Sequence, residues 1–209
     1  MRPLRFGNHR RRPGSVLLIG CGRIAPAAVT QFYDTFSELN VAITSHTPNI
    51  DLSGLGWADA TGTPRCIANN FGGVSSGENS ARFNMSVASY TLTVDVTWSG
   101  GESFIILFRF DNATYLTGWN LQYLVGSLEW RLYDPAGALV ASYGATLSNG
   151  ATYAISIVVS GNNVDVSIDG TLRLSGSSAT NNTKVVGYLF LLGPGAAPFT
   201  TFDNLLVVA

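Results

Sequence analysis

The chain has 209 residues, of which 46% are hydrophobic and only 12% are charged. Its two cysteines are too few for a disulfide framework, and no run of sequence reaches the 18 or so consecutive apolar residues that a membrane-spanning helix needs. Six of the 12 basic residues precede Asp34, the first acidic residue, whereas the chain from Asp34 onward carries 6 basic and 13 acidic side chains. The sequence therefore predicts a basic N-terminal arm joined to an acidic body.

Residues 1–30 form the predicted arm and the strand that links it to the body. The first 15 residues contain two prolines, two glycines and no apolar period, which predicts disorder unless a partner holds the arm. We expect that partner to be another protein subunit, including further copies of this chain in a homo-oligomer. Nucleic acid is the less favoured partner, because no interleaved aromatic residues or recognition fold accompany the arginines. The residues expected to bind the partner are Arg2, Arg5, Arg10, Arg11 and Arg12.

Residues 15–28 contain two motifs that the sequence as a whole does not favour. Basic residues before an apolar run are typical of a signal peptide, but the run Val16–Ile19 is shorter than the 7 to 15 residues of a secretory leader. Gly20–Ala25 fits the G-x-G-x-x-A dinucleotide fingerprint. That fingerprint requires a βαβ unit, and Pro26 and a long period-two sequence follow instead. We expect an uncleaved, extended linking strand.

The body reads as a series of β-strands. Residues 30–40 fit a strand or a helix, but Tyr90–Trp98 alternates apolar and polar residues, as a half-buried strand does. Phe104–Phe110 is apolar on both faces except at Arg109, which predicts a strand in the middle of a sheet. Val185–Leu192 has the same character, and Phe202–Val208 is expected to be a central strand beside the first strand of the body.

Residues 151–175 give the clearest strand signal. They alternate with a period of two and reverse at Gly161–Asn163 and again at Asp169–Gly170. An Asp-Gly pair supplies the positive φ angles of a type I′ hairpin turn. Three antiparallel strands with one apolar face need a second sheet to cover them. The sequence thus predicts an all-β, two-sheet antiparallel jelly-roll sandwich over residues 31–209, preceded by the extended arm.

Short motifs spread along the body carry a resemblance to a known fold family. Asp34–Phe36, Thr44–Asn49 and Trp57 resemble the opening of the concanavalin A-like lectin/glucanase (laminin-G-like) jelly rolls of bacterial and bacteriophage proteins. Further motifs continue the resemblance to the C-terminus: Arg109, Tyr115–Trp119, Asp169–Gly170, Val186–Gly187 and Phe202–Asn204. The resemblance covers residues 34–209 and implies the jelly-roll fold.

Arg109, Trp119 and Tyr123 are the candidate ligand-binding residues. A charge in an apolar strand must be paired or face a cleft, so Arg109 is expected to form an ion pair with Asp111 or Glu129, or to contact a ligand on a concave sheet. Trp119 and Tyr123 share one strand parity. They either pack in the core or, with Arg109, form an exposed surface on which sugar rings stack.

Two acidic residues are the candidate metal ligands. If the first and last strands are neighbours, Asp34 and Asp203 come close together and can share a calcium ion, which prefers carboxylate and carbonyl oxygens. The alternative is that both carboxylates accept hydrogen bonds in caps and turns. No other cofactor is expected.

The sequence does not favour catalysis. The glucanase relatives use an E-x-D-x-E strand to place two carboxylates, and no two of Glu38, Glu78, Glu102 and Glu129 have that spacing. Gly73–Gly77 matches the G-x-S-x-G nucleophile elbow, but no helix is expected after it and no histidine lies downstream. We therefore expect no catalytic residues.

Two functional hypotheses follow. In the first, the chain is a non-enzymatic virion protein, a bacteriophage capsid-surface decoration or tail-associated component assembled in the host cytoplasm. Its basic arm anchors it to other virion proteins, and its exposed jelly roll is free to bind host glycans. In the alternative, it is a secreted or cell-surface carbohydrate-binding or adhesion module, and its localisation is extracellular. Only the analogy of fold supports the binding of glycans in either hypothesis.

Overall fold

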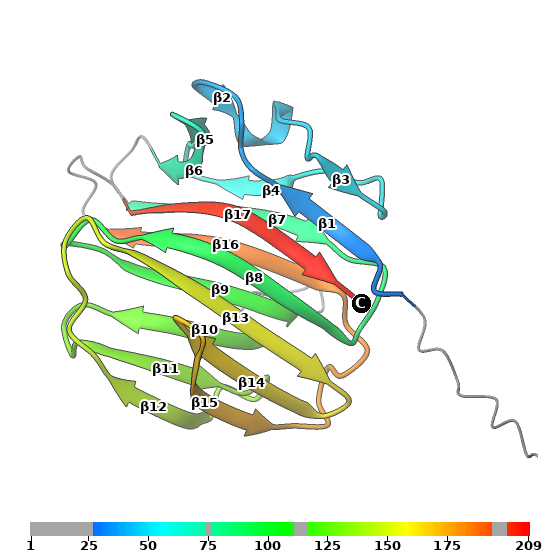
Figure 1. The fold of residues 1–209 in the computed structure, drawn as a ribbon, viewed down its shortest axis with the longest axis vertical. Coiled ribbons are helices and arrows are strands. Elements are labelled where there is room, and N and C mark those ends of the chain that lie inside the picture. Colours follow the sequence, from blue (N-terminus) through cyan, green and yellow to red (C-terminus); the bar gives the residue numbers. More distant parts are fainter. Residues whose placement is uncertain (1–26, 74–76, 111–116, 194–199) are drawn as a thin grey trace, which may run out of the picture.

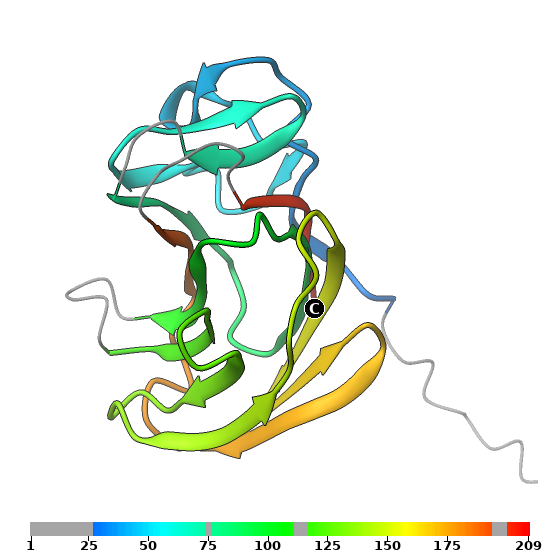
Figure 2. The ribbon, with the colours of Figure 1, turned by 90° about the vertical axis from the view of Figure 1, so that its left-hand side faces the viewer.

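Residues 27–73, 77–110, 117–193 and 200–209 are described in a computed structural model of the chain. They form two antiparallel sheets that face each other, shown from the front in Figure 1 and from the side in Figure 2. Among these residues, no helix has the length and the apolar character needed to cross a bilayer. The predicted all-β, two-sheet sandwich is confirmed.

Sheet A is the front layer in Figure 1. In spatial order it contains β15 (Thr171–Ser177), β14 (Asn163–Ile168), β13 (Thr152–Ser160), β8 (Tyr90–Thr97), β17 (Thr201–Val208), β6 (Asn70–Gly73), β5 (Pro64–Ile67) and β2 (Val41–Ala42). The strand β1 (Thr30–Asp34) also pairs with β17, and β3 (Ile50–Asp51) pairs with β1. The C-terminal strand is therefore central and lies beside the first strand, as predicted.

Sheet B is the layer behind. Its spatial order is β12 (Leu139–Gly144), β11 (Glu129–Tyr133), β10 (Trp119–Leu124), β9 (Ser103–Phe110), β16 (Val186–Gly193), β7 (Gly77–Asn84) and β4 (Ala58–Thr61). The two strands that are apolar on both faces, β9 and β16, pair with each other in the middle of this sheet. This position confirms the prediction from their composition.

Local sequence explains how the strands connect. Residues 30–34, which fit a strand or a helix, form β1, because pairing with β17 places Phe32 in the core between the sheets. The turn between β14 and β15 has φ of 50° at Asp169 and 73° at Gly170. These positive angles are the ones that a type I′ turn requires.

The core contains two groups of aromatic rings. At one end of the sandwich, Trp57 lies 5.4 Å from Phe32 and 5.9 Å from Phe71, measured between ring centroids. Farther along, Phe104 lies 5.2 Å from Trp130 and 5.9 Å from Phe202. Because β17 carries Phe202 and β9 carries Phe104, the second group joins sheet A to sheet B.

A buried carboxyl group gives the fold a pH dependence. The Thr200 N–H donates to Glu102 Oε2 (2.9 Å), and the Trp98 indole N–H donates to the Glu102 carbonyl (2.8 Å). Burial raises the pKa of Glu102 above its ordinary value, although the hydrogen bond from Thr200 opposes the shift. An acid whose pKa is higher in the folded state contributes stability at low pH, and that contribution is lost as pH rises through the folded pKa.

We expect the Glu102→Gln variant to lose part of this pH dependence. In the parent protein, this group makes the free energy of unfolding fall as pH rises above about 4.3, the ordinary pKa of glutamate. Asp203 keeps some of the slope in the variant, because burial raises its pKa too. Urea unfolding from pH 4 to 7 measures the slope, with Glu78→Gln as the control. A variant with the full parental slope would show that Glu102 is not responsible.

Candidate functional site

Some of the predicted site residues are among the described residues, and others are not. Arg2, Arg5, Arg10, Arg11 and Arg12, the predicted partner-binding residues of the arm, lie outside the described residues. Asp111, one of the two predicted ion-pair partners of Arg109, does so as well. The binding role of the arm therefore stays a prediction.

Arg109 is a structural residue in the interior. Its side chain is fully buried and its φ is 53°, a left-handed conformation that non-glycine residues adopt only in special places such as bulges. Nε and one terminal nitrogen donate to the Ala88 carbonyl at 3.0 and 2.7 Å, and the other terminal nitrogen donates to the Gly161 carbonyl. Burial lowers the pKa of the guanidinium. The ion pair with Glu129 is not formed, and a contact with an outside ligand is not possible.

Trp119 and Tyr123 are core residues. Both are fully buried. The ring of Trp119 stacks on Phe108 at 6.3 Å, and the ring of Tyr123 stacks on Phe104 at 5.8 Å. The Tyr123 hydroxyl donates to the Ala145 carbonyl at 3.2 Å. The prediction that these rings and Arg109 share an exposed sugar-stacking surface is therefore wrong, because this parity of the strand faces sheet A.

Asp34 accepts hydrogen bonds from three groups in the interior. The Phe36 N–H and His46 Nε2 each lie 2.8 Å from Oδ1, and the Trp57 indole N–H donates to Oδ2 at 2.6 Å. His46 Nδ1 is 3.2 Å from a carboxylate oxygen of Glu38. We call Asp34, His46 and Trp57 the Asp34 network. It joins three of the positions that carry the family resemblance, and the complete burial of Asp34 makes it structural.

Asp34 and Asp203 do not converge. Asp34 pairs with Leu205 on the core side of sheet A, whereas Asp203 pairs with Asp95, which alternates with the buried Val94 and Val96. The two carboxylates are thus on opposite faces of the sheet. Within the described ranges, no group of three His, Cys, Asp or Glu side chains has an arrangement that could hold a metal ion. The geometry gives the shared calcium ion no support.

The outward surface of sheet B collects a different set of residues. Directly paired residues share a face, and the core side is marked by the buried Ile106, Leu121 and Leu132. On the opposite side, the register places in one patch Ser80, Asn84, Ile105, Leu107, Asn120, Gln122 and Arg131. We call this patch the outer face of sheet B. It lies on the left of the side view in Figure 2.

The middle of the outer face is apolar and largely closed to solvent. Leu107, Phe110 and Val186 form a small buried cluster that is separate from the main core, with Ile105 and Leu192 packed against it. Leu107 is only 2% exposed although its side chain faces away from sheet A. Among these apolar residues, Ile105 and Leu192 are the partly exposed ones, so they are the ones that a ligand can touch.

Polar atoms without partners surround this apolar cluster. Ser80 Oγ, Asn84 Nδ2 and Asn120 Oδ1 are buried and make no hydrogen bond to the protein. The Ser80 residue is 1% exposed and Asn84 is 8% exposed. Leaving a buried polar group unpaired costs about 1–3 kcal/mol, and such groups in native proteins usually mark a bound molecule or a functional role. The outer face therefore contains a donor, an acceptor and a hydroxyl without partners, each just below the surface.

A charged cluster lies at the margin of the outer face. Arg131 donates to the Glu129 carboxylate and, at 3.3 Å, to the Tyr133 hydroxyl. The hydrogen bond with Tyr133 and the one with Glu129 raise the pKa of Arg131. These side chains remain partly exposed and can reach a ligand. Serine, asparagine and glutamine do not titrate near neutral pH, so the arrangement suits binding better than proton transfer.

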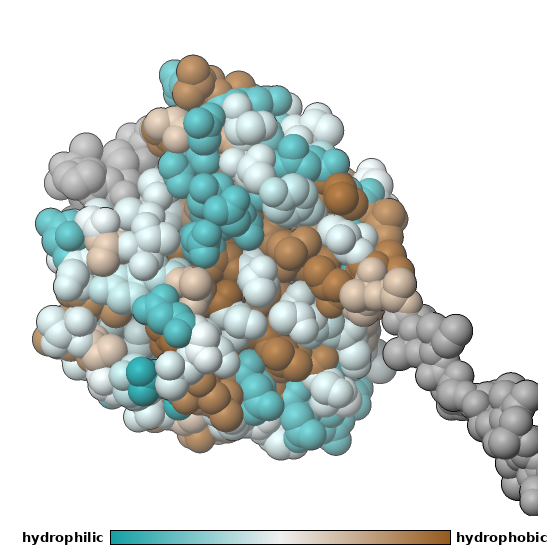
Figure 3. Space-filling model, viewed as in Figure 1, coloured by the Kyte–Doolittle hydropathy of each residue, from teal (hydrophilic) through white to brown (hydrophobic). Residues whose placement is uncertain are grey.

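The outer face of sheet A has a different character. Its polar groups pair with each other: Thr97 with Thr152 at 2.7 Å, and Asn204 with Asp95 at 2.9 Å. Figure 3, which looks onto this face, shows hydrophilic and hydrophobic residues interspersed. Because these polar groups already have partners, this face is the weaker candidate for ligand binding.

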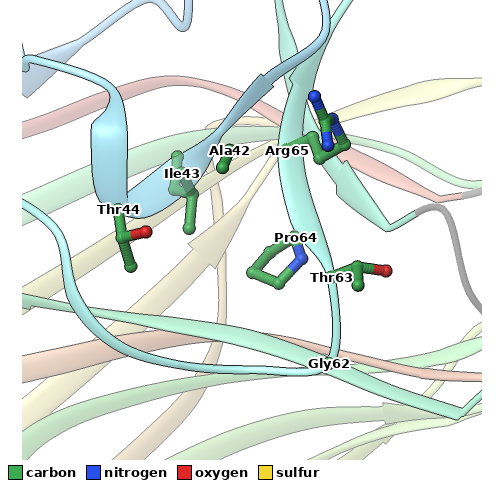
Figure 4. Close-up of a pocket in the computed structure, with 7 residues that line it drawn as sticks. All are labelled: Ala42, Ile43, Thr44, Gly62, Thr63, Pro64 and Arg65. Atoms are coloured by element: carbon green, nitrogen blue, oxygen red, sulfur yellow. The ribbon is translucent and has the colours of Figure 1, made fainter.

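A surface cavity lies close to the Asp34 network. It has a volume of about 260 Å³ and lies between the 3₁₀ helix η1 (Ile43–Ser45) and the start of β5. Thr44, Thr63 and Pro64 are among the residues that line it (Figure 4). The Arg65 side chain donates to the Asn40 carbonyl. Few polar side chains converge on this cavity, so we assign it no function.

The chain has the concanavalin A-like lectin/glucanase jelly-roll fold, as comparisons with solved structures show. A galectin-like protein of unknown function from Bacillus subtilis matches with a TM-score of 0.62 and 12% identity, over 86% of this chain and 95% of that one. The carbohydrate-binding module CBM66 from Bacillus subtilis gives 0.56 and 14%, over 71% and 92%. The carbohydrate recognition domain of Emp46p gives 0.55 and 10%, over 84% and 97%.

Comparisons by sequence give no relative. No protein-family model matches the chain, and no curated protein matches it. Because the identities with these three solved structures are 14% or lower, the similarities show the fold and not the function.

Proposed function

We propose that this chain is a non-catalytic carbohydrate-binding domain whose site is the outer face of sheet B. The observation that carries the proposal is the set of unpaired, buried polar atoms on Ser80, Asn84 and Asn120, grouped around the apolar floor at Leu107. Two solved structures with the same fold are a carbohydrate-binding module and a carbohydrate recognition domain, which supports this class of function.

An oligosaccharide matches the outer face in extent, because Ser80 on β7 and Asn120 on β10 are three strand spacings of about 4.8 Å apart. The C–H groups of a sugar make one side of its ring apolar, and this side packs against the partly exposed Ile105. The hydroxyl groups of the sugar both donate and accept hydrogen bonds, so Asn84 Nδ2 donates to a sugar hydroxyl and Asn120 Oδ1 accepts from one. Ser80 Oγ serves in either role. A ligand that pairs these atoms removes the cost of their desolvation, and this gain contributes to its affinity.

Of the two hypotheses drawn from the sequence, the second is therefore favoured. In it, the chain is a secreted or cell-surface module that acts outside the cell. The virion hypothesis depends on the basic arm, and neither the fold nor the comparisons support it. Part of a sialidase, 19% of that chain, also matches 84% of this one at a TM-score of 0.53 and 10% identity. The absence of catalysis is thus part of the proposal and needs its own assay.

Single substitutions in the outer face are expected to weaken binding without harming the fold. In Asn84→Ala and Asn120→Ala, affinity for the glycan that the parent protein selects from an array falls at least tenfold, equivalent to about 1.4 kcal/mol. The melting temperature stays the same or rises, because each variant removes an unpaired group. Calorimetric titration and thermal unfolding measure the two effects.

The matched control is Asn163→Ala, which changes an exposed asparagine on β14 of sheet A and is expected to keep parental affinity. Release of reducing sugar from the selected glycan is measured in parallel and should stay at background. A parent protein that binds no glycan, or outer-face variants that bind as tightly as the parent, would refute the proposed site.

A further inference from the structure

A second cavity lies where the margins of the two sheets approach each other near β12 and β15. It has a volume of about 130 Å³. The side chains that give it chemical character are Trp130, Tyr143, Tyr153, Asp169, Thr171 and Arg173. Trp130 lies on the core side of β11 and its neighbour Arg131 lies on the outer face, so this cavity is separate from the outer face of sheet B. We call it the Arg173 pocket.

The floor of the Arg173 pocket contains an unpaired hydrogen-bond donor. Trp130 is fully buried, and its indole N–H has no acceptor in the protein. Its ring packs against Phe104 and Tyr123. A buried N–H group without a partner is costly, and Trp130 is one of the residues that line the pocket. Leu147 and Ile168 complete an apolar floor.

Two more hydrogen-bond donors, on Arg173 and Tyr153, lie at the walls of the Arg173 pocket. The guanidinium of Arg173 is 4.5 Å above the centre of the Tyr143 ring, a cation–π contact that holds the group in place. Among the described residues, no carboxylate forms an ion pair with Arg173. The Tyr153 hydroxyl accepts the Ser148 N–H at 2.7 Å, which leaves its own O–H group free to donate.

Among the described residues that line this pocket, Asp169 is the one carboxylate, and one of its oxygens is occupied. Asp169 Oδ1 accepts the Ala154 N–H at 2.9 Å. The charged donor among the lining residues is Arg173, which pairs with no carboxylate of the described residues, Asp169 included. Arginine binds carboxylates with strong, charge-assisted hydrogen bonds, so the charge and the donors together favour an anionic oxygen ligand.

We infer that the Arg173 pocket binds a carboxylate group, with Arg173, Tyr153 and the Trp130 indole N–H as its donors. A volume of about 130 Å³ corresponds to about four water molecules and is smaller than the pockets that enclose drug-sized ligands, about 300–1,000 Å³. The ligand is therefore a small organic acid or the carboxylate end of a larger molecule such as an acidic sugar. The inference does not depend on the proposed glycan site.

The indole N–H resonance of Trp130 provides a direct test in ¹⁵N-labelled protein. The full chain is titrated separately with acetate, glucuronate and glucose, the neutral control. Glucuronate and acetate are expected to shift the Trp130 resonance in a saturable way, and glucose is expected to leave it unchanged. Equal affinities for the two acids identify a site for carboxylates in general, and tighter binding of glucuronate identifies an acidic sugar.

Arg173→Met, which keeps an unbranched apolar stem and removes the charge, is expected to weaken the binding of both acids at least tenfold. Lys184→Met removes one positive charge outside the pocket and should have no effect. A resonance that does not move with either acid, an equal response to glucose, or parental binding in Arg173→Met would overturn the inference. Loss of binding in Arg173→Met but not in Asn84→Ala separates this pocket from the outer face of sheet B.

Discussion

Replacing Asp34 with alanine is expected to lower the free energy of unfolding by about 4 kcal/mol. The substitution leaves the Phe36 N–H, His46 Nε2 and the Trp57 indole N–H without their acceptor, in a region that water does not reach. Unpaired buried donors pay their full desolvation cost. Urea unfolding followed by tryptophan fluorescence measures the loss, and fluorescence also reports the altered surroundings of Trp57.

The conservative variant and a matched control sharpen this test. Asp34→Asn keeps one oxygen acceptor, but its amide N–H₂ group faces another hydrogen-bond donor. The free energy of unfolding is therefore expected to fall by an intermediate amount. Asp165→Ala removes an exposed aspartate that accepts a hydrogen bond from Ser175 at 2.7 Å, and the expected loss is below about 1 kcal/mol. If Asp34→Ala were as stable as the control, the network would not hold this end of the sandwich together.

Replacing Arg109 with methionine is expected to cost about 3 kcal/mol. Methionine fills most of the space, but the carbonyls of Ala88 and Gly161 lose the donors that satisfy them. Since Gly161 belongs to the β13–β14 turn, amide hydrogen exchange should become faster in that turn and in the segment around Ala88. The Arg173→Met variant is the control, because its guanidinium is exposed.

Removing a buried charge can also stabilise a protein, when well-packed apolar atoms replace a poorly compensated ion. The hydrogen bonds to carbonyl groups decide between the two outcomes here, because the carbonyls stay buried after the substitution. An Arg109→Met variant with unchanged stability and unchanged exchange at Gly161 would show that the guanidinium is dispensable.

The period of two was enough to predict the strands, and it was not enough to predict which face of each strand meets the other sheet. β9 is apolar on both faces, so the direction of Arg109 depends on the left-handed conformation at that residue and on the loop carbonyls near it. These are long-range features. For the same reason, the sequence left Trp119 and Tyr123 open between core and surface, and pairing with β9 places them inside.

The candidate site was harder to predict than the fold. Asn84 and Asn120 look like ordinary polar positions of half-buried strands, and the sequence does not reveal that their amide atoms are buried and unpaired. The motifs that contain Asp34, His46 and Trp57 carry the family resemblance and could be recognised in the sequence. That His46 and Trp57 both bind the Asp34 carboxylate is seen only in the folded chain. The position of Asp203 was missed for a similar reason. The pairing of β1 with β17 makes the two strands neighbours, but the pleat determines which face of the sheet each side chain lies on.

Backbone amide shifts in ¹⁵N-labelled protein, recorded as the glycan selected on the array is added, show where on the chain the carbohydrate binds. The largest changes are expected on β7, β16, β9 and β10, around Ser80, Leu107 and Asn120. Changes confined to sheet A, or none at saturating glycan, would rule out the outer face of sheet B as the binding site.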